Sequence, residues 1–472
     1  MKRLLKLLMT MLILVVLLGN LRSIEATQSG FTNSINISNN QGDSVIPQMA
    51  VSGNDVYILW NDNSTGKFGI FLAKSTDGGT NFGAPVNISK NIGSSTSPQF
   101  AVSGNEVFVV WQGKTTGKYQ IIFAKSTDGG ATFSTPVNIS NNSGDSSFPK
   151  IAISGNNLYV TWAFTVTNKD FDILFATSSD GGTTFSTPVN LSNTLGDTGL
   201  PQITSSGNDV YVTWENNASG NFDVFVAKST DNGKTFGIPV NVSNNPKPSG
   251  APQILASGNN VYVVWMDSTP GNYDIFVAKS TDNGSTFGQP VNVSNNAGDS
   301  GYPQMTMSEN TLYVVWTDTI SNKNYDVLFA KSTDGGATFS APVNISKNIG
   351  ASGWAQITVN GNIYVIWEDS APGNYDIFIA KSTDGGATFS APDNISNTPD
   401  DSNFKQMTVS ENNVYAVWQD GLPNQHEILF AKSTTFVPEF GTLASLVLVV
   451  AIISIIILSA KTIPRLKMTS GL

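Results

Sequence analysis

The sequence contains no cysteine, a single histidine and, over most of its length, no arginine. Without cysteine the protein can form neither a disulfide framework nor a thiolate metal site. The only arginines are Arg3, Arg22 and Arg465, so residues 23–464 offer no guanidinium for bidentate binding of a carboxylate. Only 13% of the residues are charged and the formal net charge is -10. This balance argues against nucleic acid as a partner, because no basic stripe is available for phosphates.

The N-terminus has the pattern of an export signal. Lys2, Arg3 and Lys6 precede the apolar run Leu7–Leu18, and small residues stand near Ala26. We therefore predict a secretory signal peptide at residues 1–26, with an uncleaved N-terminal anchor as the alternative.

The C-terminus has the pattern of a membrane anchor. Thr442–Ala460 carries no charge and is long enough to span a bilayer as a helix. Lys461, Arg465 and Lys467 follow it, which places the C-terminus inside and the rest of the chain outside. The predicted location is therefore exported and attached to the membrane or cell surface, with a transmembrane helix at 442–460.

The motif Pro438-Glu439-Phe440 stands directly before this span. A Pro-Glu-Phe motif followed by a hydrophobic helix and a short basic tail resembles the PEF-type C-terminal sorting signal of archaeal exported proteins. The resemblance covers residues 437–472. It implies an archaeal source, an archaeosortase-type processing enzyme that removes the tail, and attachment of the protein at the cell surface. A plain transmembrane anchor is the alternative.

Eight similar segments each end in a tryptophan, at intervals of 51 residues with one interval of 52. Each unit contains four short strand-like stretches. A first stretch such as Pro252–Ala256 is followed by a β-branched and aromatic one such as Val261–Trp265, and apolar and polar residues alternate in the last two, such as Tyr273–Lys279 and Pro290–Ser294. Four antiparallel strands in a repeat of this length describe a propeller blade, with the tryptophans packed between blades. The tryptophans are Trp60, Trp111, Trp162, Trp214, Trp265, Trp316, Trp367 and Trp418.

The two ends of the repeat array are complementary. Phe31–Ser38 aligns without gaps on Phe339–Ser346, which carries the turn aromatic and fourth strand of a unit, whereas the last unit stops after Ser433, where its fourth strand should begin. We therefore predict an all-β, eight-bladed propeller at residues 31–436, closed by an N-terminal outer strand that completes the last blade.

The turn Ser-x-Asp-x-Gly-x-x-Phe occurs seven times, and its aspartate can accept hydrogen bonds from the backbone of its own turn. The motif resembles the Asp-box, or BNR repeat, of sialidases and related secreted propellers. That resemblance implies a structural role for the seven aspartates, on the face away from an active site. They are Asp77, Asp128, Asp180, Asp231, Asp282, Asp334 and Asp384.

The resemblance does not extend to a sialidase active site. Members of that family hold the substrate carboxylate with three arginines, and the predicted propeller has none. His426 lacks histidine partners for a metal site and is expected to be a solvated loop residue. Glu215 and Glu368 each follow a blade tryptophan and could form the acid–base pair of a glycosidase. However, they belong to the fourth and seventh units, so we expect them to be too far apart.

The face opposite the Asp turns should be acidic and rich in oxygen ligands. Aspartates of this face suit Ca²⁺, the one cofactor that the sequence suggests, although they are also ordinary turn formers. The candidates are Asp267, Asp274, Asp318, Asp326, Asp369 and Asp376.

Seven glutamines at one position of the unit, with Lys150 in the remaining one, are predicted to begin the innermost strands. They could form a ring at the mouth of the central channel that binds a glycan or peptide, or could instead bind channel water and backbone. They are Gln48, Gln99, Gln202, Gln253, Gln304, Gln356 and Gln406.

Every predicted outer strand carries Asn-x-Ser. In an exported protein these asparagines are candidate glycan acceptors, or simply outward-facing residues of an edge strand. They are Asn36, Asn87, Asn138, Asn190, Asn241, Asn292, Asn344 and Asn394.

The blades are nearly identical, as in Ala330–Ser346 and Ala380–Ser396, whereas an enzyme needs one asymmetric pocket. We therefore predict a surface-anchored, non-catalytic propeller for adhesion or binding of a cell-surface glycan or protein, or for an envelope scaffold. The alternative is a carbohydrate-active enzyme of the sialidase superfamily, a glycoside hydrolase without the arginine triad.

Overall fold

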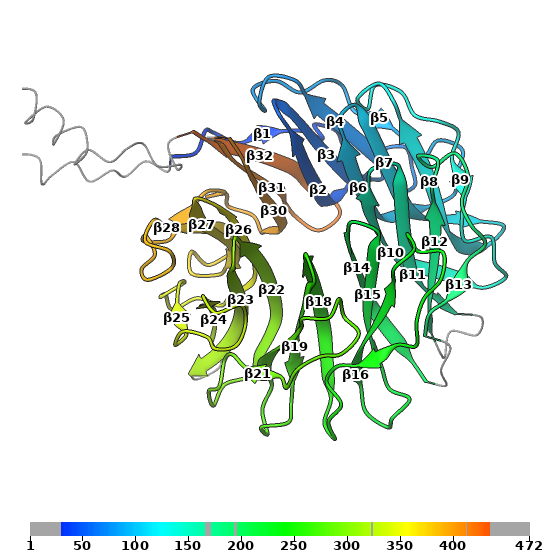
Figure 1. Cartoon of the computed structure of the whole chain (residues 1–472). Helices are drawn as coiled ribbons and strands as arrows, with labels where there is room; N and C mark the ends of the chain where they lie inside the picture. The colour runs from blue at the N-terminus through cyan, green and yellow to red at the C-terminus, as the bar shows by residue number, and fades with distance from the viewer. Residues whose placement is uncertain (1–29, 166–170, 193–195, 322–323, 412, 435–472) are drawn as a thin grey trace, which may run out of the picture.

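The computed structural model describes residues 30–165, 171–192, 196–321, 324–411 and 413–434, which form an eight-bladed propeller of four-stranded antiparallel sheets (Figure 1). The predicted all-β class and blade architecture are confirmed. The predicted signal peptide, sorting motif and transmembrane helix lie outside the described residues. None of the described segments forms a helix that could span a lipid bilayer.

The strands follow one order in every blade, from the ring axis outward. The innermost strands are β2 (Ser44–Ser52), β6 (Ser95–Ser103), β10 (Asp145–Ser154), β14 (Thr198–Ser206), β18 (Ser249–Ser257), β22 (Ser300–Ser308), β26 (Ser352–Asn360) and β30 (Ser402–Ser410). The second strands are β3 (Asp55–Asp62), β7 (Glu106–Thr115), β11 (Asn157–Thr165), β15 (Asp209–Asn216), β19 (Asn260–Asp267), β23 (Thr311–Ser321), β27 (Asn362–Asp369) and β31 (Asn413–Asp420). The third strands are β4 (Gly69–Ser75), β8 (Lys118–Ser126), β12 (Asp172–Ser178), β16 (Asp223–Ser229), β20 (Asp274–Ser280), β24 (Asn324–Ser332), β28 (Asp376–Ser382) and β32 (Glu427–Ser433). The outer strands are β5 (Val86–Asn87), β9 (Val137–Asn138), β13 (Val189–Asn190), β17 (Val240–Asn241), β21 (Val291–Asn292), β25 (Val343–Asn344), β29 (Asp393–Asn394) and β1 (Ile35–Asn36).

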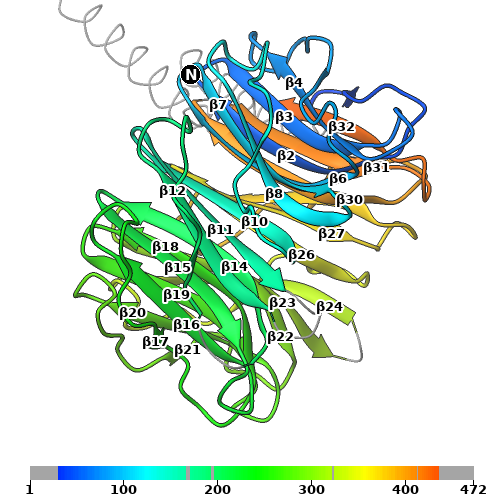
Figure 2. The same cartoon turned by 90° about the vertical axis from the view of Figure 1, so that its right-hand side faces the viewer.

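The N-terminal strand closes the ring, as predicted. β1 pairs antiparallel with β32, with Asn36 opposite Leu429, and the Ile37 amide donates to the Ile428 carbonyl at 2.7 Å. In Figures 1 and 2 the orange strands β30–β32 lie beside the blue strands β2–β4. The last blade, completed by the first strand, therefore packs against the first blade.

The hydrophobic core lies between consecutive blades. The eight repeat tryptophans are at most 1% exposed, as predicted, because each second strand is covered by a blade on either side. At the closing seam, Ile58 and Trp60 of blade 1 cluster with Val417 and Phe430 of blade 8. These apolar contacts fix each blade relative to its neighbours.

The innermost strands are longer than predicted and each contains a β-bulge. β18 runs from Ser249 to Ser257, and its register with β19 shifts between Gly250 and Gln253. Pro252 sits in this shift, because proline cannot donate to the ladder. Ala251, the residue before this proline, has a positive φ, and so do the residues at the same position in the other seven blades. The eight are Ile46, Ser97, Phe148, Leu200, Ala251, Tyr302, Trp354 and Phe404. We call these eight the bulge residues.

The bulges and the Asp turns lie at opposite ends of the blades. In blade 1, Ser44 pairs with Asp62 at one end, and Val56 pairs with Ser75, which begins the Asp turn, at the other. The bulge residues therefore lie on the face of the ring opposite the Asp turns.

Candidate functional site

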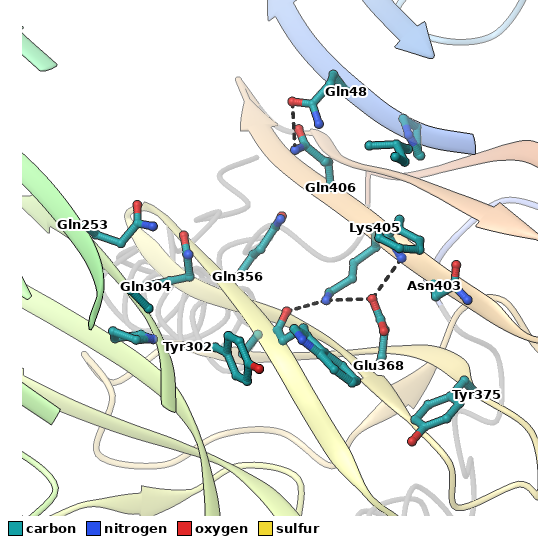
Figure 3. Close-up of a pocket in the computed structure, with 17 residues that line it drawn as sticks. Gln48, Gln253, Tyr302, Gln304, Gln356, Glu368, Tyr375, Asn403, Lys405 and Gln406 are labelled. Atoms are coloured by element: carbon teal, nitrogen blue, oxygen red, sulfur yellow. Dashed lines mark hydrogen bonds and ion pairs between the residues drawn. The ribbon is translucent and has the colours of Figure 1, made fainter. Parts of the chain in front are cut away.

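A pocket of about 570 Å³ opens at the bulge end, over the inner strands of blades 5 to 8 and blade 1 (Figure 3). We call it the channel-mouth pocket. Its ionisable side chains are Tyr302, Glu368, Tyr375 and Lys405.

The predicted glutamine ring is present in part at this pocket. Five of its members line the pocket: Gln48, Gln253, Gln304, Gln356 and Gln406. The prediction that these glutamines begin their strands is wrong. Each stands four residues after the first residue of its strand, just after the bulge. Gln48 Oε1 accepts from the amides of Gln99 and Gln406 at 3.4 and 3.2 Å. In blade 3, burial lowers the pKa of Lys150.

Aromatic bulge residues form the pocket wall, and none of them is among the predicted site residues. Tyr302, Trp354 and Phe404 are 56%, 50% and 53% exposed, and the Tyr302 and Trp354 rings lie 6.2 Å apart. A positive φ costs a bulky residue on the order of 1–3 kcal/mol, so these side chains are held outward at an energetic cost. The signal in the sequence is the residue at the bulge position of each repeat, which varies from Ser97 to Trp354.

A buried ion pair lies beneath these aromatics. Lys405 Nζ is 3.1 Å from Glu368 Oε1 and also donates to the Trp354 carbonyl (Figure 3). Burial lowers the pKa of Lys405, and the Glu368 carboxylate opposes that shift. Lys405 is not among the predicted site residues, although it breaks the repeat: six blades have proline at this position, and blade 7 has Ala355.

Glu215 and Glu368 are brought to separate places, as expected. Each bonds to the bulge of the next blade: Glu215 Oε2 accepts from the Ala251 amide at 3.1 Å, and Glu368 Oε1 from the Phe404 amide at 2.9 Å. Burial raises the pKa of Glu215, which does not line the channel-mouth pocket. Gln419 makes the same link across the closing seam to Ile46, at 3.1 Å.

The six aspartates suggested for Ca²⁺ do not converge. In the described part of the chain, no three His, Asp or Glu side chains are placed to hold a metal ion. Asp267 and Asp274 face each other across β19 and β20, but both are buried and bonded within their surroundings. Asp267 Oδ2 accepts from Trp265 Nε1 at 2.9 Å and from Asn245 Nδ2 at 2.7 Å. These six aspartates therefore provide no set of oxygen ligands for a Ca²⁺ ion.

The Asn-x-Ser sites make structural contacts in several blades. Asn292 Nδ2 donates to Asp274 Oδ2 at 2.7 Å, and Ser294 Oγ donates to Asp274 Oδ1 at 2.9 Å. The same pair of bonds recurs in blades 4 and 7, where the aspartates are Asp223 and Asp376. Tethering the outer strand accounts for the repetition of this motif, and glycosylation stays a prediction.

The Asp turns are held by their own carboxylates. Asp128 accepts from the Thr132 amide at 2.9 Å and from Ser126 Oγ at 2.7 Å. The turn phenylalanine packs on the preceding blade, as Phe82 does edge-on against Phe430 with centroids 5.0 Å apart. All of these contacts lie at the end of the blades away from the channel-mouth pocket.

His426 differs from the expectation of a solvated loop residue. Its Nδ1 lies 2.7 Å from Asp43 Oδ1, and its carbonyl accepts from the Ser44 amide at 2.8 Å. Because Asp43 precedes β2 of blade 1 and His426 precedes β32 of blade 8, this contact joins the two ends of the ring.

No family model and no curated protein matches the chain. Its propeller is similar to that of several solved structures. A polysaccharide lyase that acts on ulvan is 11% identical with a TM-score of 0.50, covering 77% of this chain and 98% of its own. A microbial sialidase is 15% identical (TM-score 0.39, 67% of this chain and 71% of its own). An α-L-arabinofuranosidase of Fusarium graminearum is 16% identical (TM-score 0.40, 61% and 92%). At these identities the likeness concerns the fold alone.

Proposed function

We propose that this protein is a carbohydrate-active enzyme that holds a polysaccharide in the channel-mouth pocket. The observation that carries the proposal is the exposed aromatic wall of Tyr302, Trp354 and Phe404 beside a buried Lys405–Glu368 pair. Aromatic faces suit the apolar faces of sugar rings, and glutamine amides suit their hydroxyls. An asymmetric pocket with a few convergent polar groups is also the usual form of a ligand site.

This proposal replaces the adhesion or scaffold role predicted from the near-identity of the blades. The blades differ at the bulge residues, and the solved structure of similar fold with a TM-score of 0.50 is named as a polysaccharide lyase. Among the residues that line the pocket, only Glu368 carries a carboxylate. Hydrolysis by paired carboxylates needs a second one roughly 5–9.5 Å away, so proton transfer here would use Glu368, Lys405, Tyr302 or Tyr375.

The test is binding and turnover of ulvan, arabinan and polysialic acid. We expect one of them to bind and to yield new chain ends, and Trp354→Ala to weaken binding at least about tenfold. Ile238→Ala is the control, because Ile238 is also an exposed apolar residue, at 93% exposure, but lies toward the Asp-turn end of its blade. The amide of the preceding residue, Gly237, donates to the Lys228 carbonyl in that region. Failure of all three polysaccharides to bind, or equal binding by the Trp354 and Ile238 variants, would overturn the proposal.

Glu368→Gln separates an enzyme from a binding module. We expect it to abolish turnover while Glu215→Gln retains turnover, since only Glu368 lines the pocket. Circular dichroism of both variants checks that they are folded. Binding without any turnover by the wild-type protein would return the assignment to a non-catalytic binding propeller.

The proposed setting is the outside of the cell, with the propeller exported and anchored at the membrane or surface through its C-terminal segment. This rests on the residue patterns at 1–26 and 437–472. Intact-mass measurement of protein recovered from a cell envelope tests it. A mass that includes residues 1–26 would contradict signal cleavage, and one that includes residues 442–472 would contradict archaeosortase processing.

A further inference from the structure

A second, smaller pocket of about 160 Å³ adjoins the channel-mouth pocket between blades 6 and 7. We call it the side pocket. Tyr302, Trp354 and Tyr375 line both pockets, so the two share a wall, whereas Tyr325 and Thr317 line only the side pocket. A ligand that leaves the channel mouth over Trp354 would enter the side pocket directly.

The side pocket has the size and lining for a single sugar ring. A cavity of about 150 Å³ holds one six-membered ring the size of benzene. Tyr325 is 49% exposed, and three tyrosines give the pocket hydroxyls that can donate and accept beside apolar ring faces.

The pocket depends on features that other blades lack. Its wall is the bulge residue Trp354, while the corresponding residues of blades 2 and 5 are Ser97 and Ala251. Tyr273 occupies the position of Tyr325 one blade earlier but lines neither pocket. The chain therefore contains its own matched control for Tyr325.

We propose that the side pocket is a second sugar-binding subsite, so that the ligand is a chain that runs from the channel mouth outward between blades 6 and 7. This inference rests on the proposed function, since it concerns the same polysaccharide. With a second subsite, affinity depends on the number of sugar units in the chain rather than on the identity of one terminal sugar.

The experiment measures affinity against chain length by calorimetry. The probes are oligosaccharides of two, four and six sugars prepared from ulvan, arabinan and polysialic acid. We expect wild-type affinity to rise with length. Tyr325→Ala should weaken the longest chain about fivefold to tenfold and leave the disaccharide unchanged, because only longer chains reach the side pocket. Tyr273→Ala should behave as the wild type.

Two results would overturn the subsite and leave the proposed function standing. One is a Tyr325→Ala variant that matches the wild type at every length. The other is an equal loss for the disaccharide and the hexasaccharide. If the wild-type protein binds none of the nine probes, both the subsite and the proposed function fail.

Discussion

At the residue scale, Lys405 shows what a departure from a repeat can mean. A lysine in place of proline puts an ammonium in the interior, where it is only 4% exposed, and Glu368 lies 3.1 Å away. Burying an ion pair is seldom a net gain in stability, because the desolvation of both charges offsets their attraction. A buried pair beside an exposed aromatic wall is therefore better explained by function than by folding.

The two glutamates provide a matched test of that pair. Glu368→Gln keeps an acceptor for the Phe404 amide but leaves Lys405 as an unpaired buried charge, so we expect the free energy of unfolding to fall by about 3–5 kcal/mol. Glu215→Gln keeps the corresponding hydrogen bond to the Ala251 amide and leaves no buried cation without a partner. The free energy of unfolding should therefore fall by less than about 1 kcal/mol. Urea unfolding measures both. Equal losses would show that the ion pair is not the distinguishing contact.

Gly79 tests how closely the blades approach at the seam. It adopts φ +75°, and an added Cβ would lie 2.6 Å from Phe430 Cζ of the last blade. We expect Gly79→Ala to lower the free energy of unfolding by about 1–3 kcal/mol more than Gly53→Ala does. Gly53 is the control because it has φ +58° with no atom within 4 Å of an added Cβ. Equal losses in urea unfolding would mean that backbone strain, not inter-blade contact, requires glycine at position 79.

At the element scale, the Asp turns link stability to pH. The Thr132 side chain and amide and the Ser126 hydroxyl lower the pKa of Asp128 to about 2, and Asp231 has the same pKa and corresponding partners. A carboxyl group whose pKa is lower in the folded state stabilises the fold above its unfolded pKa of about 3.9 and loses that contribution as pH falls.

We therefore expect the melting temperature to fall between about pH 4 and pH 2, and to fall less steeply in Asp128→Asn. Thermal melts across this range measure the slope. An unchanged slope in the variant would show that the Asp128 turn does not contribute to acid sensitivity. Asp209→Asn is the control, since that carboxylate lies outside the Asp turns.

At the scale of the whole molecule, the repeat in the sequence is sufficient to predict the propeller architecture. The alignment of Phe31–Ser38 on a fourth strand predicted ring closure, because a blade edge must be paired, and β1 does pair with β32. The site was harder to predict. Glu368 was identified, but its contact with Lys405 depends on a bulge in the next blade. A positive φ at Trp354 or Phe404 cannot be read from residue type, since bulky side chains rarely adopt it.

Trp354 offers the most direct test of polysaccharide binding in the channel-mouth pocket. All nine tryptophans lie in the described part of the chain; eight are at most 1% exposed, and Trp354 is 50% exposed at the channel-mouth pocket. Acrylamide quenching of the intrinsic fluorescence should therefore report on this residue alone. We expect a bound polysaccharide to protect Trp354 from quenching, and we expect Trp354→Phe to remove the effect. A polysaccharide that binds by calorimetry yet leaves the quenching unchanged would contradict binding in the channel-mouth pocket.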